Sequence, residues 1–219
     1  MTVDVRLLAV LALPIAYLFA LVQFGLWLIQ RQRRAHLWWA AGNAVAALGA
    51  TLLVLRDVAP LWVTSSLANS VLLASGFVIW WAMARFAGRR APIRILAMVT
   101  VLYFGLFEWL WHFNSDLGLR VLLASLASAA LNVGIAIELM RAQHERHLKD
   151  RSLLVTVFFL HALFLLFRAG TAVTLDASQD LMQANGIQNV TVLVSALKVL
   201  AWNIGAVLML REQQGLLKA

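Results

Sequence analysis

The sequence has no cysteine and few charged residues, and each scarcity excludes a class of protein. Without cysteine the chain has no disulfide, no thiolate metal site and no cysteine nucleophile. Only 13% of the 219 residues are Asp, Glu, Lys or Arg, whereas a soluble domain has about a quarter. Hydrophobic residues make up 63%, and the mean hydropathy is +0.84. The composition therefore predicts an integral membrane protein.

Acidic residues are scarce as well, since 10 Asp and Glu accompany 18 Lys and Arg and leave a net charge of +8. The basic residues lie in short segments between apolar runs, a distribution that indicates membrane topology and not a nucleic-acid-binding surface. The sequence also lacks the HExxH spacing of zinc enzymes, a glycine-rich phosphate loop and a convincing Ser/His/Asp triad. We therefore expect neither an enzyme nor a nucleic-acid-binding protein.

Seven apolar runs are long enough to cross a bilayer, which takes about 17–25 helical residues. The first run is too long for the core of a signal peptide and lacks a clear cleavage site, so we interpret it as a retained helix. We expect an all-α, polytopic membrane protein, with a seven-helix domain over residues 1–210 and the start of a connector helix over residues 211–219. The runs are Leu7–Ile29, Leu37–Leu55, Leu61–Ala84, Ile95–Phe113, Arg120–Met140, Leu153–Thr174 and Ile187–Leu210.

The distribution of Lys and Arg predicts the orientation of these helices. The loops after the first, third and fifth runs, together with the C-terminal tail, hold most of the basic residues, whereas the alternate side has only Arg6, Arg56 and Arg120. Because basic loops stay in the cytoplasm, we expect the N-terminus outside and the C-terminus inside. Segment Leu175–Gly186 then forms an outer loop that could cover the mouth of the bundle.

Small and amide side chains recur inside the runs. The second run contains Gly42 and Gly49, and small residues of this kind let helices approach closely in lipid. Four asparagines are candidates for hydrogen bonds between helices or for ligand contacts, and the first role is the more common one. They are Asn43, Asn69, Asn132 and Asn203.

Five acidic, basic or histidine side chains lie within the fourth, sixth and seventh apolar runs, where a charge is costly and marks a candidate functional site. Helical spacing places two of them on one face of the fourth run and two on one face of the sixth. The fifth lies near the midplane of the seventh run, on the same face as Trp202. We therefore expect these helices to present all five side chains towards one interior. They are Glu108, His112, His161, Arg168 and Lys198.

These charges leave several alternatives open. Glu108 and Arg168 have similar depths, so they could form an ion pair that simply joins two helices. Lys198 would then be left without an acidic partner. It could bind an anionic ligand, lose its proton through desolvation, or form a Schiff base with an aldehyde such as retinal. The histidines within the runs are too far apart in depth for a zinc pair, and the spacing does not support haem. We therefore expect no resident cofactor.

Several short segments, from about the second run onward, match a known family pattern in their order and spacing. They are Leu48–Arg56, Pro60, Ser66–Asn69, Arg85–Arg89, Tyr103-Phe104, Asn114 with Arg120, His161 with Phe167-Arg168, and Trp202–Gly205. In order and spacing they resemble the multi-helix, MASE-like sensor region that precedes GGDEF diguanylate cyclase domains in bacteria. The resemblance implies an inner-membrane input module, often dimeric, whose last helix signals to a cytoplasmic cyclic-di-GMP enzyme. The sequence itself contains no GGDEF or EAL motif, and Lys198 is not part of the pattern.

Together these features predict a sensor that binds a small amphiphilic or anionic ligand among the third to seventh helices. A retinal-type photoreceptor is one alternative, although the third run offers no carboxylate as counter-ion for Lys198. A small-molecule transporter is another, although no internal repeat is evident, and a bare structural anchor would leave costly buried charges unexplained. The candidate ligand-binding residues are Asn69, Glu108, His112, Arg120, His161, Arg168, Lys198 and Trp202.

Overall fold

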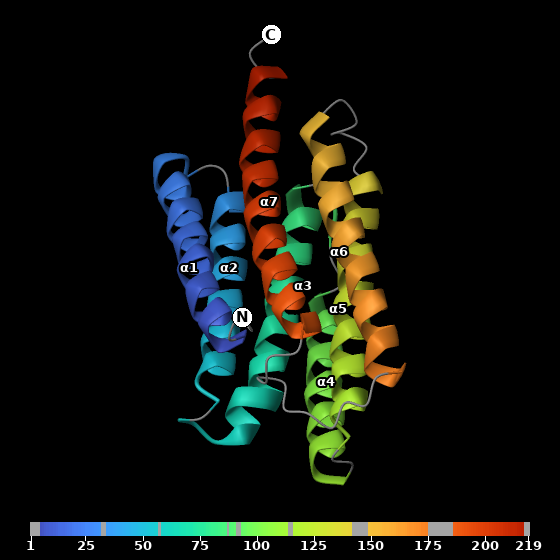
Figure 1. The fold of residues 1–219 in the computed structure, drawn as a ribbon. Coiled ribbons are helices and arrows are strands. Elements are labelled where there is room, and N and C mark those ends of the chain that lie inside the picture. The colour runs from blue at the N-terminus through green and yellow to red at the C-terminus, as the bar shows by residue number, and fades with distance from the viewer. Residues whose placement is uncertain are drawn as a thin grey trace.

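The structure, a computed structural model, describes residues 5–31, 34–56, 58–86, 88–90, 93–113, 116–141, 149–174 and 186–216. These residues form seven α-helices and no strand, and a π-helical turn at Val63–Leu67 leads into the third helix (Figure 1). All seven spans are long and apolar enough to cross a membrane, which confirms the predicted architecture for the described residues and is consistent with a multi-pass membrane protein. The helices are α1 (Val5–Ile29), α2 (Arg34–Val54), α3 (Ala68–Phe86), α4 (Ile93–Phe113), α5 (Leu117–Arg141), α6 (Lys149–Thr174) and α7 (Gly186–Leu216).

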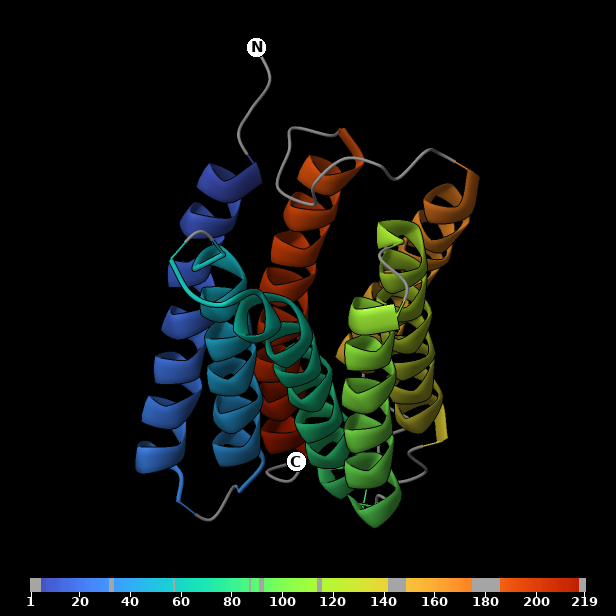
Figure 2. The same ribbon diagram turned by 90° about the horizontal axis from the view of Figure 1, so that it is seen from below.

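Six of the helices form a closed ring. Helix α1 packs on α2 and α7, α2 packs on α3, α3 on α5, α5 on α6, and α6 on α7. Helix α4 lies outside this ring against α3 and α5, and it makes no backbone contact with α6 or α7 in the described part of the chain. Figure 2 shows α3 crossing diagonally from the α1–α2 pair towards α4. The position of α4 decides which of the predicted charges can meet.

The middle of the ring is filled by large apolar side chains. Trp39, Met83, Phe158, Trp202 and Met209 come from four different helices and are at most 1% exposed. Side chains of this size exclude solvent and lipid from the centre, so polar groups beside them depend on one another for hydrogen bonds. Trp202, which the sequence left open as a packing or ligand-facing residue, belongs to this core.

Glycines allow the closest helix contacts, as their positions in the second run predicted. A Cβ atom at Gly42 would lie 2.7 Å from the Ile79 side chain of α3, and one at Gly49 would lie 2.8 Å from Leu72 and 3.0 Å from its backbone nitrogen. A real side chain would not fit at either position without moving α2 away from α3. Packing of this kind holds helices together in lipid, where the hydrophobic effect does not drive their association.

Exposed arginines gather at one end of the bundle, where α1 ends and α2 begins (top of Figure 1). Helix α3 ends at this level in a Schellman motif, in which Gly88 has a φ of 71° and the amide of Arg89 bonds the carbonyl oxygen of Ala84 at 2.8 Å. The turn brings Arg89 Nε to 2.9 Å from the Glu138 carboxylate of α5. The predicted outer loop, residues 175–185, lies outside the described residues, and the orientation of the bundle stays a prediction.

We expect Gly49→Ala to lower the free energy of unfolding by about 1–3 kcal/mol, because the new methyl group forces α2 and α3 apart. The measurement is thermal and denaturant unfolding of the purified protein in detergent. Gly25→Ala is the matched control, since a Cβ there meets no atom within 4 Å. It should leave stability unchanged or raise it by up to about 1 kcal/mol through helix propensity. Equal effects of the two substitutions would contradict the packing argument.

The predicted orientation can be tested by labelling single cysteines, because the natural sequence has none. Val58, at the end away from the arginines, is 78% exposed, and Arg90 is exposed at the arginine-rich end. A membrane-impermeant maleimide should label Val58→Cys on intact cells and Arg90→Cys only after the cells are opened. The reverse pattern would place the N-terminus inside.

Candidate functional site

Two groups of polar side chains inside the bundle connect several helices, and both include residues of α7. The first, which we call the outer cluster, joins α5, α6 and α7 in the half of the bundle away from the arginine-rich end. It consists of Ser125, Asn132, His161, Arg168, Gln188 and Lys198. The second, the inner amide cluster, joins α1, α2 and α7 in the other half, and it consists of Gln23, His36, Asn43 and Asn203.

Arg168 connects three helices at the outer level of the outer cluster. Its guanidinium donates to Ser125 Oγ of α5 at 3.1 Å and to Gln188 Oε1 of α7 at 3.2 Å. Tyr103 of α4 is close enough to interact with it electrostatically. The Nε atom is buried without a hydrogen-bond partner in the described residues. Arg168 therefore has neutral partners here, and its Nε–H has no acceptor among the described residues.

His161 and Lys198 form the deeper level of the outer cluster. His161 precedes Arg168 by seven residues on α6, and Lys198 belongs to α7. His161 Nδ1 lies 3.3 Å from Asn132 Oδ1 of α5, and its Nε2 is buried with no hydrogen-bond partner among the described residues. The ammonium of Lys198 lies 5.1 Å above the ring of Phe158 and is near enough to His161 to interact electrostatically. No carboxylate of the described residues pairs with Lys198, so the level has an excess of positive charge.

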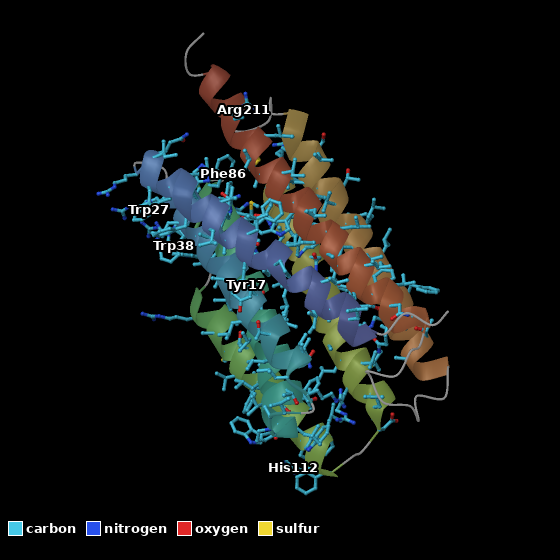
Figure 3. The ribbon with its side chains drawn as sticks, turned by 60° about the vertical axis from the view of Figure 1, so that its left-hand side comes forward. Tyr17, Trp27, Trp38, Phe86, His112 and Arg211 are labelled. Atoms are coloured by element: carbon cyan, nitrogen blue, oxygen red, sulfur yellow. The ribbon has the colours of Figure 1, made fainter. Side chains whose placement is uncertain are left out.

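The ion pair between Glu108 and Arg168, which the sequence left open as one alternative, is not formed in the structure. Glu108 Oε2 instead lies 3.3 Å from His112 Nε2, one turn along α4. Because α4 lies outside the ring and has no backbone contact with α6 or α7, Glu108 and His112 do not join the outer cluster. The His112 side chain is 65% exposed and lies at the end of the bundle opposite Arg211 (Figure 3). Helical spacing correctly placed Glu108 and His112 one turn apart on one face of α4, but it could not give the neighbours of that face.

Two other candidate residues, Asn69 and Arg120, have partners outside the outer cluster. Asn69 donates to the carbonyl oxygen of Ser65 in the preceding turn at 2.8 Å. The guanidinium of Arg120 lies 4.3 Å above the ring of Trp111, which joins α5 to α4. Of the eight candidate residues, His161 and Lys198 lie together at the deeper level of the outer cluster, Arg168 lies at its other level, and Trp202 packs in the core one turn beyond Lys198.

The inner amide cluster connects α7 to α1 and α2. Asn43 and Asn203 exchange two hydrogen bonds of 2.8 and 3.1 Å, and Gln23 Nε2 donates to Asn203 Oδ1 at 3.4 Å. Gln23 Oε1 lies 2.7 Å from His36 Nδ1. All four side chains are at most 2% exposed. The predicted role of Asn43 and Asn203 in joining helices is thus confirmed for this pair.

His36 and Gln23 are functional candidates that the sequence argument missed. The basic segment before His36 suggested a loop, but α2 begins at Arg34 and carries His36 into the bundle. Gln23 is the only amide in the first apolar run before Gln30, and this isolation was the available signal. A glutamine in lipid needs a partner, as an arginine does, although the absence of charge makes it less conspicuous.

The chain matches no protein-family model, no curated protein and no solved structure. The resemblance to GGDEF-associated sensor regions therefore stays a prediction. The two clusters differ in their hydrogen bonding: His161 Nε2 and Arg168 Nε of the outer cluster are buried without a partner among the described residues, whereas Asn43 and Asn203 bond each other.

We expect Asn43→Leu and Asn203→Leu each to lower the free energy of unfolding by about 1–3 kcal/mol, because each leaves its partner buried and unpaired. The free energy of unfolding of the double variant should fall by less than the sum of the decreases in the two single variants. The measurement is a double-mutant cycle by denaturant unfolding in detergent. Asn69→Leu is the control and should cost less, since its amide bonds only its own helix. Additive losses would show that the two asparagines do not act together.

Proposed function

We propose that this protein is a membrane-embedded sensory input domain, which binds a small anionic or amphiphilic ligand in its outer cluster and transmits the binding event through α7. The observation that carries the proposal is the course of α7. This single helix of 31 residues contains Gln188 and Lys198 of the outer cluster and Asn203 of the inner amide cluster. It then continues from the apolar span, which ends at Met209, to Leu216.

The ligand class follows from the unmatched charge. Arg168 and Lys198 have no carboxylate partner among the described residues, and a buried cation needs an anion or strong hydrogen-bond acceptors. Large apolar side chains, including Phe158 and Trp202, surround the deeper level. A ligand with a negatively charged or strongly accepting head and an apolar body would therefore match both the charge and the surroundings.

Transmission requires that the ligand bind one arrangement of the helices more tightly than another. The outer half of α7 contacts α6 and, through Arg168, the side chain of Ser125 on α5. Its inner half bonds Asn43 of α2 and Gln23 of α1. A ligand that changes the spacing of α6 and α7 would consequently strain or release the bonds to α1 and α2. The end of α7 would then move relative to the rest of the bundle.

The proposed output is a cytoplasmic domain that follows α7, such as a diguanylate cyclase. This part rests on the resemblance of the sequence, as do the bacterial inner membrane and a homodimer. The predicted topology is consistent with it, because it places the end of α7 in the cytoplasm. The retinal alternative is less well supported, since no carboxylate pairs with Lys198 in the described residues.

The test is native mass spectrometry of the gently purified protein, combined with organic extraction. We expect a stoichiometric anionic amphiphile that is lost, or at least tenfold depleted, in Lys198→Met, because an anion in an apolar site depends on its cation. Arg211→Met is the control, because it removes an exposed positive charge from the same helix at the other end of the bundle. Wild-type protein that carries no small molecule, or a ligand retained in Lys198→Met, would contradict the proposal.

The relay can be separated from binding with Asn203→Leu. This substitution lies on α7 away from the outer cluster and removes the bonds to Asn43 and Gln23. The ligand should still be present at full stoichiometry, while the output of a reporter domain fused after α7 changes. An unchanged output, with ligand bound, would contradict a relay through the inner amide cluster.

A further inference from the structure

The hydrogen bonds around His161 fix where its proton lies. Asn132 Nδ2 donates to the carbonyl oxygen of Ser128 at 2.7 Å, and this orients the amide so that its Oδ1 faces His161. An amide oxygen can only accept, so His161 Nδ1, at 3.3 Å, must carry the hydrogen. A neutral imidazole has one N–H, which leaves Nε2 with a lone pair. That lone pair is buried with no donor among the described residues.

Lys198 has the opposite hydrogen-bonding requirement. Its ammonium has three donors and no acceptor, and the ring of Phe158 is its contact in the described residues. Phe158 and His161 are three residues apart on α6, so they lie on the same helix face one turn apart. A direct bond from Lys198 to His161 Nε2 would satisfy both groups, but this bond is not formed. One level of the outer cluster therefore presents an acceptor beside a set of donors.

We infer that the ligand carries a hydroxyl donor next to a carboxylate, so that the hydroxyl donates to His161 Nε2 while the carboxylate accepts from Lys198. This inference rests on the proposed function and specifies its ligand as a hydroxycarboxylate with an apolar body. A monoanion matches the single ammonium at this level, since Arg168 lies two turns away and already bonds Ser125 and Gln188.

Three probes separate the requirement for a hydroxyl from the requirement for a carboxylate. The first, 3-hydroxydecanoate, has both the hydroxyl and the charge; decanoate has only the charge, and methyl 3-hydroxydecanoate has only the hydroxyl. Their dissociation constants are measured by calorimetry on the protein in lipid nanodiscs. We expect the dissociation constant of 3-hydroxydecanoate to be at least about tenfold lower than that of either other probe. Decanoate lacks the bond to His161, and the ester lacks the charged bond to Lys198. Equal affinities for the three probes would overturn the inference.

Variants assign each preference to its residue. In His161→Phe the preference for the hydroxyl should disappear while decanoate still binds, and in Lys198→Met the preference for the acid over its ester should disappear. Asn132→Leu is a second test of the tautomer, because it frees His161 Nδ1 and should reduce the preference for the hydroxyl. His112→Phe, at an exposed histidine, is the control and should change neither preference. A hydroxyl preference that survives in His161→Phe would overturn the assignment.

The outcomes also separate this inference from the proposed function. If none of the probes binds but a different molecule co-purifies stoichiometrically and depends on Lys198, the sensor proposal stands and the hydroxycarboxylate is wrong. If the probes bind in the expected order but a reporter fused after α7 does not respond, the site stands and the sensor proposal is wrong.

Discussion

The constraint on which this structure depends is that polar side chains inside a bundle of apolar helices must find partners within the protein. The partners of α7 lie on different helices at different depths, with Arg168 of α6 in the outer half and Asn43 of α2 in the inner half. Hydrogen bonds are directional, whereas apolar packing is not. These bonds therefore fix both the rotation and the depth of α7 in the ring.

The rest of the ring is held by a different kind of contact. Helices α2 and α3 approach closely through Gly42 and Gly49, and Gly76 of α3 faces Leu131 of α5 in the same way. Close backbone packing leaves little room for sliding, because any displacement produces overlap. Helix α7 packs less extensively on α6 and α1 than α2 does on α3. Of the two, α7 is thus better suited to move, and its position depends on a few specific hydrogen bonds.

Length and apolarity were sufficient to predict the seven helices, because each must span the same thickness of hydrocarbon. Periodicity also gave the common face of His161 and Arg168. It could not give the neighbours of a helix, and so Glu108 and His112 were expected to share one interior with Arg168 although α4 lies outside the ring. His36 was misplaced because its basic surroundings resemble a loop, and only the tertiary structure brings Gln23 of α1 to it.

The two polar clusters differ in how completely they are bonded, and this difference assigns their roles. In the inner amide cluster, Asn43 and Asn203 exchange hydrogen bonds and also bond backbone carbonyl oxygens, so a ligand would have to break bonds to enter. In the outer cluster, His161 Nε2 and Arg168 Nε are buried without partners in the described part of the chain, so a ligand there would supply bonds that are missing. A buried unpaired group costs about 1–3 kcal/mol, so the proposed binding in the outer cluster would gain free energy that could be coupled to a shift of α7. In the proposed relay, the hydrogen bonds of the inner amide cluster would oppose that shift and so would set how much of this free energy is needed.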